Sequence, residues 1–293
     1  MTRRTRTASY GWEFVAPALL LIGMFVVLPC IWGIGMSFAQ YDGIAPPRFV
    51  GVANYARLAG DPMVPATLIN TAFYVLLTLP VGLALALAIA LALNAKWFRA
   101  RNFVRGLYFL PNVTSLAAVA FVWQWLLNPE FGLLNAGLRG AGLPTYGWLS
   151  DPKLAMPSVA AVGLWQGLGF TVLIYLSGLR GISEEIHEAA RIDGAGAWAG
   201  FRNITWPLLM PTTMFLTIMG VIGGFQVFQS VYVMTQGGPL DRTRVYLYYL
   251  WQSAFQNLEM GYASAMAVLL FAIVMLLTAL QWRFYGRKLQ TWQ

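Results

Sequence analysis

Long apolar stretches alternate with short polar segments along the whole chain. Six stretches contain no Asp, Glu, Lys, Arg or His, and they cover residues 14–41, 62–95, 106–129, 154–179, 203–240 and 260–282. Each reaches the roughly 20 apolar residues that a helix needs to cross a bilayer. The pattern therefore predicts an all-α integral membrane protein with six transmembrane helices.

Two of these stretches need closer placement. Residues 203–240 are too long for one crossing and too short for two, and prolines 207 and 211 with the Gly-Gly-Pro at 237–239 punctuate them. We place that span near 208–233. The first stretch follows several arginines like a signal peptide, but it is much longer than the apolar core of one. We therefore expect residues 14–41 to remain as the first membrane helix.

The basic residues indicate which side of the membrane each segment faces. With a cytoplasmic N-terminus, the inside segments hold thirteen of the nineteen Lys and Arg residues and the outside loops hold six. Because cytoplasmic segments carry the excess of Lys and Arg, both termini are predicted to be cytoplasmic. The predicted parts are a cytoplasmic N-terminus at 1–13, a first helix with an extracytoplasmic loop at 14–66, a membrane core at 67–282 and a cytoplasmic C-terminus at 283–293.

Composition agrees with a membrane protein and argues against nucleic-acid binding. The chain is 58% hydrophobic and 10% charged, with a mean hydropathy of +0.62, whereas soluble domains carry about 25% charged residues. The net charge of +8 comes from basic residues scattered between apolar runs. Such residues form no basic stripe for nucleic acid, and basic loops facing anionic lipid explain them.

The sequence contains no recognisable motif for catalysis, metal binding or nucleotide binding. None of the three lysines ends a Gly-x-x-x-x-Gly-Lys-Ser/Thr loop. The single histidine, His187, has no cysteine cluster or second histidine beside it and is expected to be exposed. No carboxylate lies deep in a span, which argues against a proton-coupled pump. We therefore predict no catalytic residue, no metal and no cofactor in this chain.

The segment between the fourth and fifth spans gathers acidic residues where basic ones are expected. It reads as a short helix that Ser183 caps and Gly194 ends, with two glutamates at the positive end of its dipole. A second short helix is predicted around residues 197–201. One face of the first helix carries Ile186, Ala189, Ala190 and Asp193. A loop of both charge signs favours a protein partner.

This segment resembles a known loop. The runs Glu188-Ala189-Ala190 and Asp193-Gly194-Ala195, followed by the proline-containing run 204–211, are similar to the EAA loop of ABC-importer permeases of the maltose-type carbohydrate and glycerol-phosphate group. Residues 49–55, 70–71, 110–111, 235–239 and 261–267 also read like that family, and the Gly-Gly-Pro element resembles the first of its two permease subunits.

The resemblance implies a type I ABC importer permease fold in a bacterial inner membrane, with the EAA loop at 183–211. It also implies four partner proteins. They are a second homologous permease, two ATP-binding-cassette ATPase subunits that hold ATP-Mg, and an extracytoplasmic solute-binding protein. In this reading the loop sits in a groove on an ATPase, where Glu188 pairs with a basic group. The coupling residues implied are Glu188, Ala189, Ala190, Asp193 and Gly194.

Polar side chains inside spans point to the passage, because such groups are costly in lipid. Gln226 and Gln229 are expected on one helix face, with Phe225 beside them to stack on a sugar ring. Glutamines can equally hold helices together, so this alternative stays open. The passage candidates are Gln124, Gln166, Phe170, Phe225, Gln226 and Gln229.

The function expected is therefore import of a mono-, di- or oligosaccharide. One alternative is a permease of the same group for glycerol phosphate or another small polar solute. A phosphate would favour an arginine along the passage, and the predicted spans contain none. A channel or membrane scaffold that works without nucleotide is the second alternative, and it leaves the full loop pattern unexplained.

Overall fold

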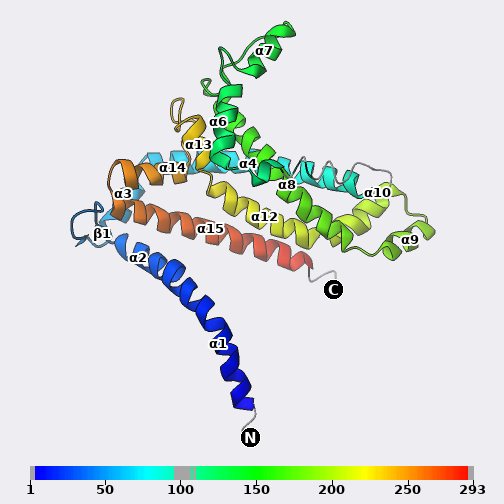
Figure 1. Ribbon diagram of the computed structural model, residues 1–293, viewed down its shortest axis with the longest axis horizontal. Helices are drawn as coiled ribbons and strands as arrows, with labels where there is room; N and C mark the ends of the chain where they lie inside the picture. Colours follow the sequence, from blue (N-terminus) through cyan, green and yellow to red (C-terminus); the bar gives the residue numbers. More distant parts are fainter. Residues whose placement is uncertain (1–3, 96–105, 107, 109, 290–293) are drawn as a thin grey trace. The chain divides into compact units, whose positions relative to one another are not determined.

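The computed structural model describes residues 4–95, 106, 108 and 110–289, and these residues are mostly helical (Figure 1). The strands described are β1 (Ala39–Gln40) and β2 (Arg48–Phe49), which pair antiparallel with Ala39 opposite Phe49. The chain divides into two compact units, residues 1–62 with 250–271 and residues 63–249 with 272–293.

Five helical stretches among the described residues are long and apolar enough to cross a membrane. They are Phe14–Met36, Met63–Asn94, Ala155–Arg180, Met210–Met234 and Met260–Tyr285, with mean hydropathies between 1.5 and 2.6. These stretches correspond to five of the six predicted spans.

The remaining predicted span, 106–129, is not one continuous helix where it is described. The backbone leaves helical conformation at Ser115, with φ −56° and ψ 125°, and α6 (Leu116–Leu126) begins directly after it. Thr114 contributes to this break, because its backbone N–H donates to the Pro111 carbonyl in a tighter turn. The predicted span at 106–129 is therefore interrupted at residues 114–115.

The first unit contains an N-terminal helical run, the two strands and a short helix. Its elements are α1 (Arg4–Ile22), a π-helical turn (Gly23–Val27), α2 (Leu28–Met36), α3 (Ala53–Gly60), a second π-helical turn (Gln252–Gln256) and the beginning of α15 (Met260–Leu289). The Asn54 amide donates to the Ser37 and Ala39 carbonyls, 2.9 Å each. A Cβ at Gly261 would collide with the Ala39 carbonyl, so glycine permits this close approach.

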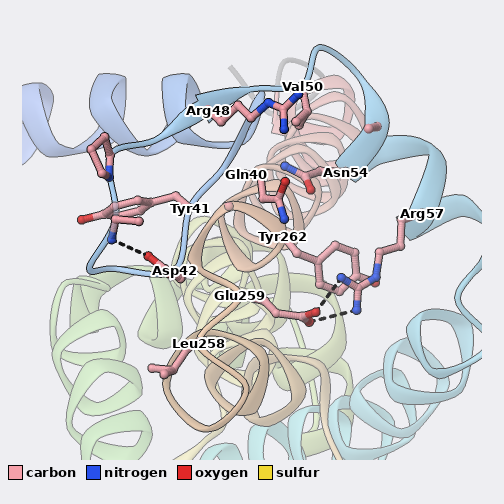
Figure 2. A pocket seen from close by; sticks show the side chains of 14 residues that line it. Gln40, Tyr41, Asp42, Arg48, Val50, Asn54, Arg57, Leu258, Glu259 and Tyr262 are labelled. Atoms are coloured by element: carbon pink, nitrogen blue, oxygen red, sulfur yellow. Dashed lines mark hydrogen bonds and ion pairs between the residues drawn. The ribbon is translucent and has the colours of Figure 1, made fainter.

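A polar pocket of about 460 Å³ lies inside the first unit (Figure 2). Arg57 donates to both carboxylate oxygens of Glu259, at 2.8 and 2.9 Å, and lies 4.1 Å from the centre of the Tyr262 ring. The Tyr262 hydroxyl bonds to Asp61 at 2.6 Å. Nearby, backbone N–H groups two and three residues after Asp42 donate to its carboxylate and hold its pKa below the ordinary value. These contacts fix the loop that frames the pocket.

The second unit is built on three long helices. α4 (Met63–Asn94) packs along α8 (Ala155–Arg180), and α12 (Met210–Phe225) packs against both. Ala86 and Ala90 of α4 are fully buried beside Val172 and Leu176 of α8. Because small side chains let helix backbones approach closely, this alanine face accounts for the tight α4–α8 contact.

Shorter elements complete the second unit. They are α7 (Leu133–Gly140), α9 (Glu184–Ile192), α10 (Ala197–Gly200), a π-helical turn (Phe201–Thr205), α11 (Trp206–Leu208) and α13 (Gln229–Met234), with α14 (Tyr246–Trp251) at the unit's edge. α13 packs against α6.

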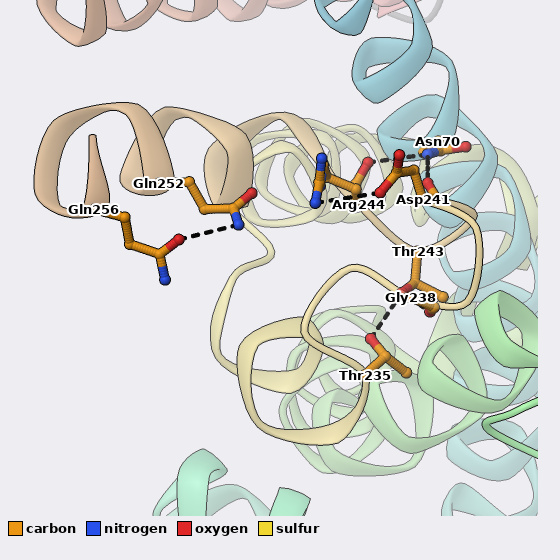
Figure 3. A network of polar contacts seen from close by, with 8 residues as sticks. All are labelled: Asn70, Thr235, Gly238, Asp241, Thr243, Arg244, Gln252 and Gln256. Atoms are coloured by element: carbon orange, nitrogen blue, oxygen red, sulfur yellow. Dashed lines mark hydrogen bonds and ion pairs between the residues drawn. The ribbon is translucent and has the colours of Figure 1, made fainter. Parts of the chain in front are cut away.

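The segment after α13 is a tightly held turn (Figure 3). The Asn70 amide of α4 donates to the carbonyls of Asp241 and Arg244, at 2.8 and 2.9 Å. The buried Thr243 hydroxyl lies 2.5 Å from the Gly238 carbonyl and 2.7 Å from the Thr235 hydroxyl. The Gly-Gly-Pro element singled out in the sequence therefore belongs to a fixed turn and not to a continuing helix.

Candidate functional site

The helix predicted between the fourth and fifth spans is present with its expected ends. α9 covers Glu184–Ile192, and the Ser183 hydroxyl accepts from the backbone N–H of Glu185 at 3.3 Å. Gly194 ends the turn with φ +82°, a conformation that glycine adopts without strain. The second short helix is also confirmed, as α10.

Four of the five coupling candidates are exposed. Glu188, Ala189, Asp193 and Gly194 are exposed, and Ala190 is half-buried. A cavity of about 750 Å³ lies behind the helix, and Ala190 and His187 line it. His187 is therefore half-buried, and the expectation that it would be exposed is wrong.

A groove of about 390 Å³ runs between the three long helices of the second unit. Many of its lining residues are glycines, at positions 82, 163, 167, 220, 223 and 224. None of the described lining residues is charged. Its polar lining comes from Tyr74, Thr78, Asn112 and Thr171. Such a surface suits a neutral solute with many hydroxyl groups.

The polar groups of the groove retain hydrogen-bonding capacity. Tyr74 is 7% exposed, and its hydroxyl has no hydrogen-bond partner among the described residues. A Cβ at Gly163 would collide with that hydroxyl, so glycine at this position makes room for it. Thr78 and Thr171 donate to carbonyls one turn earlier in their own helices, which leaves their oxygens able to accept.

The structure places one of the predicted passage residues at this groove. Phe170 lines it and is 40% exposed. Gln166, one turn earlier, donates instead to the Thr114 carbonyl at 3.4 Å, which is the helix-joining role left open by the sequence. Gln124 is exposed on α6 and does not line the groove.

The prediction that Gln226 and Gln229 share one face of a single helix is wrong. α12 ends at Phe225, the backbone of Gln226 has φ −97° and ψ 11°, and α13 begins only at Gln229. Gln226 therefore lies in the turn after α12 and Gln229 begins α13, and both are exposed outside the groove, while Phe225 is buried. Gly223 and Gly224 explain the break, because glycine disfavours helix.

Sequence reasoning missed the groove because its residues are small or modestly polar. A signal was nevertheless present. Tyr74 and Thr78 are four apart on one helix, and Gly163, Gly167 and Thr171 follow at intervals of four on another. Residues four apart share a helix face. A search for faces that combine glycine with hydroxyl groups would have found both walls.

Comparison with known proteins gives consistent matches. The family described as binding-protein-dependent transport system inner membrane component matches residues 79–289. A probable ABC transporter permease protein, PH1215 of Pyrococcus horikoshii, is 35% identical over 98% of this chain and 99% of its own. The lactose transport system permease protein LacF of Rhizobium radiobacter is 32% identical over 95% and 94%.

Solved structures share the fold. A chain of the bacterial alginate ABC transporter, crystallised with an alginate pentasaccharide-bound periplasmic protein, superposes with a TM-score of 0.85 at 21% identity. The match covers 98% of this chain and 97% of that one. The likeness therefore extends over both units described above.

Proposed function

Because the chain belongs to the family of binding-protein-dependent transport system inner membrane components, we propose that it forms half of the passage of an ABC importer for a sugar. The relatives support a sugar, since LacF is named for lactose transport. The chain is a membrane permease component, and the solute enters through it in this proposal.

The groove between α4, α8 and α12 carries the proposal. Its volume of about 390 Å³ lies within the roughly 300–1,000 Å³ of small-molecule sites. Tyr74, Thr78 and Thr171 contribute hydroxyl groups to its lining, and Phe170 contributes a phenyl ring. The hydroxyls of a sugar can hydrogen-bond to these hydroxyl groups, and the apolar face of its ring can stack on the phenyl ring. The uncharged lining gives a phosphate ester no cation to pair with.

The loop at α9 supplies the proposed link to energy. ATP is hydrolysed on two separate ATPase subunits, and one of them receives Glu188, Ala189, Ala190, Asp193 and Gly194. Closure of the ATPases then moves α9, and α8 and α12, which flank the loop, transmit the movement to the groove. A second permease covers the open side of the groove, and a solute-binding protein delivers the sugar from the side opposite the cytoplasmic termini.

The test is uptake of labelled mono-, di- and oligosaccharides and of glycerol phosphate into vesicles that carry the complete complex. We expect one sugar to enter only with ATP. Glu188→Ala should abolish this uptake, whereas Glu185→Ala, which removes an exposed carboxylate from the same helix outside the motif, should not. If uptake is the same with and without ATP and is unchanged in Glu188→Ala, the protein is a channel and not an importer.

The groove is tested by removing one hydroxyl at a time. Tyr74→Phe and Thr171→Val should raise the KM for uptake about tenfold each, the cost of about one lost hydrogen bond of 1–1.5 kcal/mol. Gln124→Ala, outside the groove, is the matched control and should leave KM unchanged. If both groove variants transport like the parent, the sugar passes elsewhere.

A further inference from the structure

The helical run from α10 to α11 presents an aromatic face interrupted by a single cation. Trp198, Arg202 and Trp206 follow at intervals of four and share one side of this run. All three are exposed, Trp198 at 69% and Trp206 at 37%. They lie in the C-terminal part of the loop at 183–211, after α9, and none of them is among the coupling candidates on and beside α9.

Phe201 packs against both tryptophan rings, and we call the side chains of Trp198, Phe201, Arg202 and Trp206 together the cradle. The ring centre of Phe201 lies 5.7 Å from that of Trp198 and 6.4 Å from that of Trp206. A cavity of about 380 Å³ is lined by these three rings and Arg202 alone. The Arg202 guanidinium has no ion-pair partner among the residues that the structure describes. The cavity is thus apolar apart from one uncompensated positive charge.

The cradle stands where the chain enters the membrane. Trp206 is four residues before Met210, the first residue of a membrane-crossing stretch. Tryptophan prefers the headgroup level of a bilayer, and the planar guanidinium of arginine matches the oxygens of a phosphate. We propose that Trp198, Phe201, Arg202 and Trp206 bind one anionic phospholipid, with its phosphate on Arg202 and its glycerol region against the rings.

Such a site would hold lipid at the base of the coupling loop. The run 197–208 joins α9 to α12, so a lipid in the cradle anchors the end of the loop that leads into α12. Movement of α9 would then be directed into α12 and not lost in a shift of the whole loop. The proposal rests on the membrane location of α12 and does not require the solute to be a sugar.

The test is native mass spectrometry of the purified full-length chain, titrated with phosphatidylglycerol and separately with phosphatidylcholine. One favourably placed arginine should give the parent about a fivefold preference for phosphatidylglycerol. Arg202→Gln should abolish that preference. Arg191→Gln removes an exposed arginine from α9 on the same loop and should keep it.

Three results would overturn the proposal. Retention of the preference in Arg202→Gln would exclude the cradle, and its equal loss in Arg191→Gln would show attraction by diffuse charge. Trp198→Ala, which keeps the charge, should weaken binding of both lipids and serves if Arg202→Gln does not fold. A further assay measures ATPase activity of the complete complex in phosphatidylcholine vesicles with and without phosphatidylglycerol. If Arg202→Gln lowers this activity equally in both kinds of vesicle, the cradle contacts the ATPase and does not bind lipid.

Discussion

Residues 129–148, which follow α6, form a lobe around α7, and replacing Asn135 with alanine should open it. Asn135 is fully buried in α7 and uses its whole hydrogen-bonding capacity. Its amide donates to the carbonyls of Pro129 and Tyr146, at 3.0 and 2.8 Å. Its oxygen accepts from the Tyr146 backbone at 3.2 Å and from the Trp148 indole at 3.0 Å. One side chain thus joins both ends of the lobe.

The size of the effect follows from these bonds. Each bond contributes about 0.5–1.5 kcal/mol net, and buried groups left without a partner cost about 1–3 kcal/mol each. Alanine breaks all four, so the free energy of opening the lobe should fall by about 3 kcal/mol or more. Asn135→Asp keeps the two accepted bonds but puts a carboxylate oxygen against the carbonyls of Pro129 and Tyr146, so this buried, unpaired charge should destabilise the lobe at least as much as alanine does.

Hydrogen exchange measured by mass spectrometry reports this opening directly. Amides within residues 129–148 should exchange about 100-fold faster in Asn135→Ala, because about 3 kcal/mol corresponds to two orders of magnitude. Asn203→Ala, at an exposed asparagine, is the control and should leave those amides protected. Unchanged protection in Asn135→Ala would show that the four bonds do not hold the lobe.

Three further predictions concern single positions. Gly194→Ala should impair ATP-dependent uptake, because alanine is strained at φ +82° by about 1 kcal/mol, while Gly196→Ala, with φ −69°, should be tolerated. Arg57→Lys should lower the melting temperature slightly, because lysine cannot reproduce the two-bond contact with Glu259 and such exposed pairs contribute at most about 1 kcal/mol. The pKa of Asp42 is lowered in the fold, so its stabilising contribution is present at neutral pH and lost as the pH falls below the ordinary value of 3.8; Asp42→Asn should weaken this acid dependence in thermal melts.

The sequence predicted well what depends on neighbouring residues. The helix at 184–192, its serine cap and the glycine that ends it follow from local capping chemistry, and the structure confirms them. The all-α membrane class and the permease family depend on long apolar stretches and a spaced motif, and the matches to known proteins confirm both. The roles of Glu188 and its neighbours, and the cytoplasmic position of both termini, stay predictions.

The groove was harder to predict because it is made by three helices distant in sequence. No local rule brings Tyr74 beside Gly163, and this meeting makes the groove. Glutamine was favoured for its polarity, yet Gln226 follows the end of α12 and Gln166 joins α8 to a neighbouring carbonyl. Polarity inside a predicted span therefore did not identify the residues that line the groove.

The open groove also bears on how a cell can make this protein. Newly inserted chains meet lipid before they meet other subunits, and the half-buried hydroxyls of Thr78 and Thr171 would then lie beside acyl chains along a wall of glycines. Polar groups exposed to hydrocarbon are unfavourable, and glycine walls offer little side-chain surface to compensate. A chain produced alone should consequently be a substrate for membrane proteases, and its lifetime should lengthen when a second permease is synthesised with it.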